Sequence, residues 1–215
     1  MSYPDLTRSL DPATLSLVGL TPLLAVCTTL ISGLSMGLAY LAVLILTCVT
    51  VSCSRRFIPG RVSRICFLLV SAAWVSIIDL LMQACCFALR EQLGIYLYLL
   101  AMNTTLLFHL EAFPLRKNFR ESATTILKTA TTGVTLLTLT GLLRELAAQG
   151  GVLTDIRLLS YLDGLASLQP FYIFTSGLPL FDSSAGAFIV FGLLLAVLSL
   201  SSPGRMHLFG LAADD

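Results

Sequence analysis

The sequence predicts an all-α integral membrane protein with six transmembrane helices. The chain has 215 residues, of which 56% are hydrophobic and only 12% charged, and its mean hydropathy is +0.90. Soluble domains carry about a quarter charged residues. Six stretches are mostly apolar over roughly the 20 residues that a helix needs to cross a bilayer. The bilayer is therefore the expected surroundings, and since no basic face is present we expect no nucleic-acid partner.

The six predicted spans follow one another closely, except before the last. They are Thr14–Ile31, Met36–Cys53, Ile65–Leu89, Leu93–Leu110, Ala123–Leu146 and Ala185–Leu200. Short connections make neighbouring helices antiparallel. The exception is the segment 147–184, which contains the aromatic run Phe171–Phe174. This run is too short for a seventh span, and we expect an interfacial element or a docking site for a partner subunit.

The first and fourth spans are predicted to be interrupted. Pro22 lies within the first, where it removes a backbone donor. Five polar residues lie in or just after the second half of the fourth: Asn103, Thr104, Thr105, His109 and Glu111. Polar groups at bilayer depth face protein or a wet cavity. The two interrupted spans open two halves of one membrane domain, 1–91 and 92–215, an arrangement that predicts two inverted three-helix repeats with a site between broken helices.

The basic residues predict the orientation. Six spans place both termini on one side of the membrane, and that side has ten Lys and Arg residues. The opposite side has three, namely Arg90, Arg144 and Arg157. The positive-inside rule then places both termini in the cytoplasm and 147–184 outside it. The N-terminus lacks a basic region leading into a short apolar core, so we expect no cleaved signal peptide.

Two carboxylates are candidates for ion or proton handling. Asp79 lies in the third span with Gln83 one turn later on the same helix face. An unpaired carboxylate within the bilayer is costly, so it is either a functional group or a hydrogen-bonded packing residue. Glu111 ends the fourth span, where the alternative is an interfacial ion pair with a nearby basic residue. Arg144 and Glu145 close the fifth span and are expected to be interfacial anchors.

The cysteines predict neither a disulfide framework nor a zinc site. All six lie in or beside apolar runs, none forms a CxxC pair, and the two histidines are not grouped with them. Most are expected to be small buried hydrophobic residues. The sequence also lacks the motifs of nucleotide-binding loops, zinc proteases and serine hydrolases, so no self-contained enzyme of those classes is expected.

Several short motifs together resemble a known family. They are GLTPLLAVCTTL (residues 19–30), SRRFIP (54–59), LGIYLYLL (93–100), the polar run from Asn103 to Phe113, LRELAAQG (143–150) and GAFIVFGLLLA (186–196). In this order and spacing they are similar to the E subunit of the Rnf (Rsx) electron-transport complex and, more distantly, to the D subunit of the sodium-pumping NADH:quinone oxidoreductase. The resemblance covers about residues 17–196.

The resemblance implies a membrane subunit of a redox-driven ion pump. In that family, a six-span subunit pairs with the like-folded A subunit within a complex that also contains subunits B, C, D and G, in the bacterial inner membrane. The complex transfers electrons between ferredoxin and NAD and translocates sodium ions or protons. The two sister subunits each supply two cysteines, from their two broken helices, to a shared [2Fe-2S] cluster.

The sequence departs from the family at both cysteines. The family pattern GLCP reads Gly19-Leu20-Thr21-Pro22 here, and the pattern TNC reads Met102-Asn103-Thr104. Iron–sulfur clusters need soft thiolate ligands, so Thr21 and Thr104 are not expected to bind iron. Cys27 is a possible substitute thiol for one of them. Either the cluster is absent or carried elsewhere, or a neighbouring thiol substitutes, or the chain has a structural role; we favour loss of the two ligands.

Two other functions remain as alternatives to the pump subunit. A small inverted-repeat transporter would use Asp79 and the broken helices as its own cation or substrate site. A structural paralogue would keep the fold and docking surfaces without carrying electrons. The order of the motifs favours the pump subunit and the paralogue over the transporter.

Overall fold

The computed structural model describes residues 19–54, 63–103, 119–155, 171–172 and 179–200. Within them, three helices are long and apolar enough to cross a membrane: α3 (Leu30–Ser54), α4 (Ser63–Cys85) and α8 (Phe119–Gln149). They correspond to the second, third and fifth predicted spans. The expected class, a helical membrane protein, is therefore borne out, while the described part contains fewer long spans than the six predicted.

Shorter elements make up the rest of the described chain. Residues 19–24 are helical. After α4 come α5 (Phe87–Leu93), α6 (Ile95–Leu99) and the 3-10 helix η1 (Leu100–Met102). Strands β1 (Gly151–Val152) and β2 (Phe171–Tyr172) form an antiparallel pair, and η4 (Pro179–Asp182) precedes α9 (Ser184–Leu200). Helix α9 matches the sixth predicted span to within one residue, and its apolar part, Ser184–Val197, is shorter than the other three.

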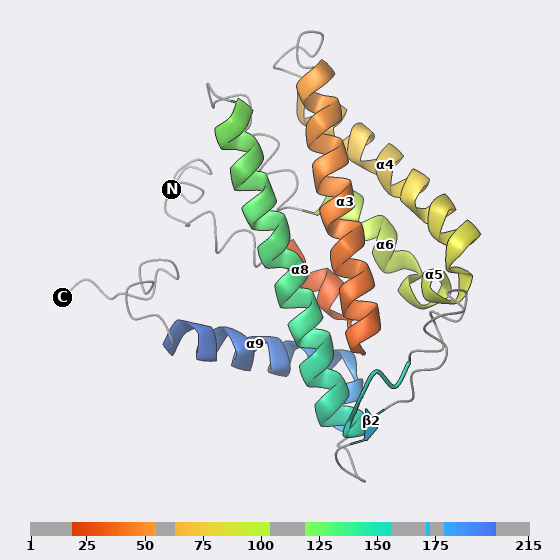
Figure 1. Cartoon of the computed structure of the whole chain (residues 1–215), viewed down its shortest axis with the longest axis vertical. Coiled ribbons are helices and arrows are strands. Elements are labelled where there is room, and N and C mark those ends of the chain that lie inside the picture. The colour runs from red at the N-terminus through yellow and green to blue at the C-terminus, as the bar shows by residue number, and fades with distance from the viewer. Residues whose placement is uncertain (1–18, 55–62, 104–118, 156–170, 173–178, 201–215) are drawn as a thin grey trace, which may run out of the picture.

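Helices α3 and α8 form the centre of the molecule. They run side by side, with α4 on the other side of α3 and α9 crossing the end of α8 (Figure 1). Glycines allow the close approach: a Cβ built on Gly33 would lie 2.6 Å from the carbonyl oxygen of Leu137, and one on Gly133 would lie 2.6 Å from the ring of Tyr40. Gly33 and Gly37 are spaced as GxxxG, the small-residue pattern of close helix pairs in membranes.

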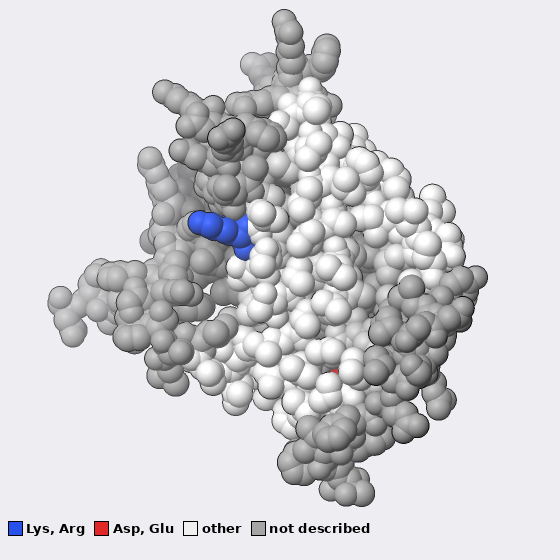
Figure 2. All heavy atoms as spheres, viewed as in Figure 1, with Lys and Arg blue, Asp and Glu red and all other residues white. Residues whose placement is uncertain are grey.

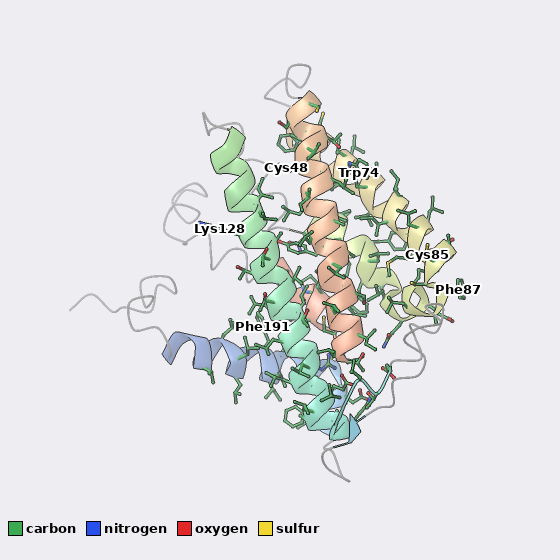
Figure 3. The ribbon with its side chains drawn as sticks, in the orientation of Figure 1. Cys48, Trp74, Cys85, Phe87, Lys128 and Phe191 are labelled. Carbon is green, nitrogen blue, oxygen red and sulfur yellow. The ribbon has the colours of Figure 1, made fainter. Side chains whose placement is uncertain are left out.

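One face of the described part is almost free of charge. In Figure 2 the described atoms on the visible face are nearly all uncharged, apart from a basic group over α8 and a small acidic spot. Figure 3 places Lys128 on the outer side of α8. The exposed face of α4 includes Ile65, Leu69, Leu80 and Leu81, each more than half exposed. Large apolar side chains without protein neighbours are what a lipid-facing helix carries.

The third predicted span ends earlier than expected. The sequence predicts that it continues to Leu89, but α4 ends at Cys85 and α5 is a separate helix. The backbone bends at Cys86, with φ −145° and ψ 61°. Hydropathy does not detect this bend, because the residues on both sides are apolar and neither proline nor glycine marks it.

One of the two predicted interruptions is seen in the described residues. The first lies at 25–29, after helical residues 19–24 that include Pro22, so the chain breaks a few residues later than the proline. In the fourth span, α6 gives way to η1 and then to an extended backbone at Asn103 (ψ 123°). The remainder of that span, with Thr104, His109 and Glu111, lies outside the described residues.

Candidate functional site

Asp79 lies at the centre of a polar cluster that joins three helices. We call Asp79, Gln83, Arg90 and Tyr98 the Asp79 cluster. Asp79 and Gln83 come from α4, Arg90 from α5 and Tyr98 from α6. Asp79 is only 5% exposed although its helix carries an apolar outer face. The aspartate lies in the second half of α4, closer to its C-terminal end than to its start.

The carboxylate of Asp79 accepts four hydrogen bonds. Arg90 donates from Nε to Oδ1 at 2.8 Å and from Nη2 to Oδ2 at 3.2 Å. Tyr98 donates its hydroxyl to Oδ2 at 2.7 Å, and the Gln83 amide donates to Oδ2 at 3.2 Å. A carboxylate offers about four lone-pair positions, so these donors satisfy it. The forked contact from Arg90 is the geometry that makes guanidinium–carboxylate pairs strong.

Arg90 stays charged in this arrangement. Its hydrogen bonds with Asp79 raise its pKa above the ordinary value. Nη2 also donates to the hydroxyl of Tyr98 at 3.2 Å, which ties the tyrosine to both members of the ion pair. Asp79 and Gln83 lie on one face of α4, as predicted, and are joined by a hydrogen bond. The sequence does not reveal Arg90 and Tyr98 as partners of Asp79. Arg90 is eleven residues after Asp79, and only the bend at Cys86 brings it back to the carboxylate.

The first helix break is held by two buried charged residues of α8. Glu145 Oε2 accepts a hydrogen bond from the backbone N–H of Leu30 at 2.8 Å, at the start of α3. Its other oxygen accepts from the N–H and hydroxyl of Thr154, at 2.5 and 2.6 Å. A carboxylate at a helix N-terminus satisfies a donor that the helix leaves unpaired and complements the helix dipole. Thr29 and Ser32 complete this end by exchanging side-chain and backbone hydrogen bonds.

Arg144 binds the backbone carbonyls on the N-terminal side of the same break. From α8 it donates to the carbonyls of Leu24 and Cys27 at 3.2 and 2.8 Å, with a longer contact of 3.5 Å to Ala25. It also donates to three carbonyls around η4, those of Phe181, Asp182 and Ser183, at 3.0 to 3.1 Å. Arg144 is 1% exposed and Glu145 0%. Their prediction as interfacial anchors is therefore wrong: they are internal, because the two ends of a broken helix expose backbone groups that need charged partners.

Asp155 lies beside this pair, after the end of α8. Burial and the neighbouring carboxylate of Glu145 raise its pKa, while polar interactions with Thr29 and Gln92 lower it. Two carboxylates this close disfavour the charged form of one of them. Asp155 is half-buried, whereas Glu145 accepts three hydrogen bonds of its own, from Leu30 and Thr154.

Replacing Asp155 with asparagine should make stability less dependent on pH. Because the pKa is raised in the fold, the folded chain binds more protons than the unfolded chain between the ordinary and the raised value. The contribution of protonated Asp155 is complete at low pH and falls as the pH rises through that interval. The melting temperature of the purified chain between about pH 4 and about pH 7 tests this, and we expect a shallower decline for Asp155→Asn. The exposed Glu91→Gln is the control, and equal slopes for all three proteins would contradict the assignment.

The structure brings only some of the predicted site residues together. Thr21 is half-buried in helical residues 19–24, and Cys27 is fully buried in the core at the break, where its thiol donates to the carbonyl of Leu23 at 3.3 Å. Both are distinct from the Asp79 cluster. Thr104 and Glu111 lie outside the described residues. Among the residues that are described, no three His, Cys, Asp or Glu side chains gather as metal ligands would.

Long apolar helices, a broken helix whose ends have buried charged partners, and an ion pair on a buried aspartate define the class of this protein: a helical membrane protein. Comparison with known proteins identifies the family within this class. A model of the family described as "Rnf-Nqr subunit, membrane protein" matches residues 9–195. The chain therefore belongs to the Rnf-Nqr family of membrane subunits.

Three of its relatives are named as the E subunit of an ion-translocating oxidoreductase complex. The protein of Pseudoalteromonas atlantica is 33% identical, over 91% of this chain and 84% of the relative. That of Haemophilus influenzae is 33% identical over 87% and 80%, and that of Shewanella oneidensis 35% identical over 87% and 81%. The resemblance found from the motifs is thus confirmed across nearly the whole chain, and the chain is a membrane subunit related to electron-transport complexes.

Proposed function

We propose that this chain is a membrane subunit of a redox-driven, Na+- or H+-translocating ferredoxin:NAD oxidoreductase complex in a bacterial inner membrane. The observation that carries the proposal is similarity over nearly the full length to subunits of ion-translocating oxidoreductase complexes. The like-folded A subunit is its direct partner, alongside subunits B, C, D and G. Six spans with both termini in the cytoplasm, as two inverted repeats, complete the proposed architecture.

The ends of two helical stretches support this architecture. The break at 25–29 and the end of η1 at Met102 lie near the starts of the two proposed halves, where inverted repeats place their interrupted helices. The charged pair Arg144 and Glu145 gives the first break partners for both of its ends. A break whose two ends both have hydrogen-bond partners is a stable part of the fold, and a site formed between half-helices requires such a stable break.

The described residues do not fit the family's [2Fe-2S] cluster. Thr21 offers a hydroxyl where the family has a thiol, and a neutral hydroxyl is a poor ligand for iron in such clusters. The thiol of Cys27 is enclosed in the core and donates to Leu23. Thr104 makes the same substitution in the sequence at the other family position. No electron-transfer step is therefore assigned to these residues.

Asp79 is the proposed ion-handling group, with Glu111 as a second candidate. Replacing Asp79 with asparagine should impair coupled ion transport more than assembly, because asparagine keeps the size and some hydrogen bonds but cannot carry the charge. Electron-driven Na+ and H+ uptake by inverted membrane vesicles measures coupling, and co-purification of the complex measures assembly. Normal ion pumping by the Asp79→Asn complex would remove Asp79 from the mechanism.

The two alternatives make different use of the same residues. A stand-alone transporter would need Asp79 but no redox partners. A structural paralogue is favoured by the threonines at positions 21 and 104, and it would tolerate the loss of Asp79 wherever the fold survives. The vesicle experiment separates the paralogue from the pump subunit, since of these two the pump subunit alone requires the charge at Asp79.

A further inference from the structure

Helix α5 is a short arm between two backbone irregularities. At its start, Cys86 has φ −145° and ψ 61°; at its end, Gly94 has φ 47° and ψ −129°, a conformation that favours glycine. Cys85 and Phe87 lie at the outer edge of this junction (Figure 3). Hydrogen bonds from Cys86 N–H to Met82 and from Arg90 N–H to Cys86 carry the chain through the bend. The ends of short elements are where hinge motions absorb changes of backbone angle, and α5 has an irregular residue at each of its ends.

The arm carries Arg90 onto Asp79. The side chain of Arg90 is 28% exposed, whereas that of Asp79 is 7% exposed. Arg90 therefore lies between the carboxylate and the outside of the molecule. Leu89 and Leu93 attach α5 to the core, while Phe87, Ala88 and Glu91 on its remaining surface are exposed. Arg90 is the polar attachment of α5 to α4, beside the apolar attachment that Leu89 and Leu93 provide.

Among the described elements that pack against α4, only α5 supplies a cation to balance Asp79. The sequences of α3 and η1 contain no Asp, Glu, Lys or Arg, and α6 adds only tyrosines as titratable groups. Helix α5 carries Arg90 and the exposed Glu91, and within α4 the remaining charged residue is Arg64, fifteen positions before Asp79. With Arg90 in place the Asp79 cluster is neutral, and a second cation there would be repelled by the guanidinium in surroundings of low dielectric constant. A bound cation and Arg90 thus exclude one another at this carboxylate.

We propose that Arg90 is a tethered counter-ion which a monovalent cation replaces at Asp79 when α5 turns away from α4. This inference rests on the proposed role of Asp79 in ion handling and adds the device that controls access to it. Once Arg90 leaves, both Asp79 oxygens, the Tyr98 hydroxyl and the Gln83 amide oxygen remain as oxygen ligands. Oxygen ligands suit hard cations such as Na+, and a proton on the carboxylate is the alternative occupant.

The test compares the purified full chain with Arg90→Gln, Asp79→Asn and the double variant. Melting temperature is measured in NaCl from about 1 mM to about 100 mM, with choline chloride holding the ionic strength constant, because a ligand that binds only the folded chain raises its stability with concentration. We expect the native chain to be insensitive to Na+. Arg90→Gln should melt at a higher temperature as Na+ rises or as the pH falls, and the double variant should lose both responses.

Each outcome of the melting experiment either supports or contradicts the replacement of Arg90 by a cation. Arg90→Lys keeps the charge and should remain insensitive to Na+, like the native chain. An Arg90→Gln protein that ignores both Na+ and pH would overturn the proposal, as would one that fails to fold in NaCl and in choline chloride alike, since a replacement cation should restore the balance. A response to pH but not to Na+ would support the proton as the occupant.

Failure of this inference is separable from failure of the proposed function. The melting experiment needs no partner subunit, whereas the vesicle experiment with Asp79→Asn measures coupled transport by the assembled complex. A cation response in Arg90→Gln with normal pumping by Asp79→Asn would keep the cation site and remove it from transport. The opposite pair of results would keep Asp79 in transport and show that no cation replaces Arg90 there.

Discussion

Gly141→Ala is expected to destabilise the chain by about 3 kcal/mol, at the upper end of what overpacking costs. A Cβ on Gly141 would overlap the carbonyl oxygen of Thr29, which is backbone and cannot rotate aside. That carbonyl accepts hydrogen bonds from the Gly33 N–H at 2.9 Å and the Ser32 hydroxyl at 2.9 Å, at the start of α3. The added methyl group would therefore separate α3 from α8 and disturb the cap of the first helix break. Unfolding in mixed detergent micelles measures the loss.

Gly192→Ala is the matched control. It makes the same chemical change in α9, where a Cβ would meet no atom within 4 Å. Alanine is the better helix former by up to about 1 kcal/mol, so this variant should be as stable as the native chain or slightly more stable. Equal losses in the two variants would show that close packing of α3 on α8 is not what makes Gly141 necessary.

Arg144→Met is expected to abolish the folded state or to lower its stability by more than about 3 kcal/mol, since each stranded buried carbonyl costs about 1–3 kcal/mol. The native guanidinium donates hydrogen bonds to two sets of backbone carbonyls. One set belongs to the first helix break and the other lies around η4. Methionine fills much of the volume and donates nothing. The fraction of monodisperse protein in gel filtration and the detergent unfolding midpoint both measure the effect.

Arg144→Lys tests geometry against charge. Lysine keeps the positive charge but has three donors on one atom, so it cannot reach both sets of carbonyls. We expect an intermediate stability for it. Lys128→Met removes an exposed cation from the same helix and should leave stability unchanged. An Arg144→Met protein as stable as Lys128→Met would mean that the carbonyls find other partners and that Arg144 does not hold the break.

The long apolar helices were predictable because hydropathy over 20 residues depends on composition alone. Helices α4 and α8 begin within four residues of their predicted starts for that reason, whereas α3 begins at Leu30, six residues before the predicted Met36. Their ends were less predictable: the bend at Cys86 lies in apolar sequence, and the first break follows Pro22 by several residues. That break is stabilised by side chains 115 or more positions away, as the contact of Glu145 with Leu30 shows. Such partners cannot be found by reading a single stretch.

The candidate site was predictable in its main residue but not in its partners. A lone carboxylate in an apolar helix identified Asp79, and helical spacing identified Gln83. Arg90 and Tyr98 reach Asp79 only because α5 and α6 fold back along α4. The end of a predicted span is an ordinary place for charged residues such as Arg144 and Glu145, so their local sequence does not reveal that they contact a helix break 115 or more positions away. Glu111 and Thr104 lie outside the described residues, and their roles stay predictions.

Purification of the tagged chain from its native membranes in a mild detergent is the most direct measurement. A subunit of an ion-translocating oxidoreductase complex should elute in fixed proportion with a like-folded membrane partner and with proteins that carry flavin and iron–sulfur clusters, visible in the absorption spectrum of the purified material. A chain that elutes alone, or only with copies of itself, from membranes in which those partners are present would contradict the proposed function.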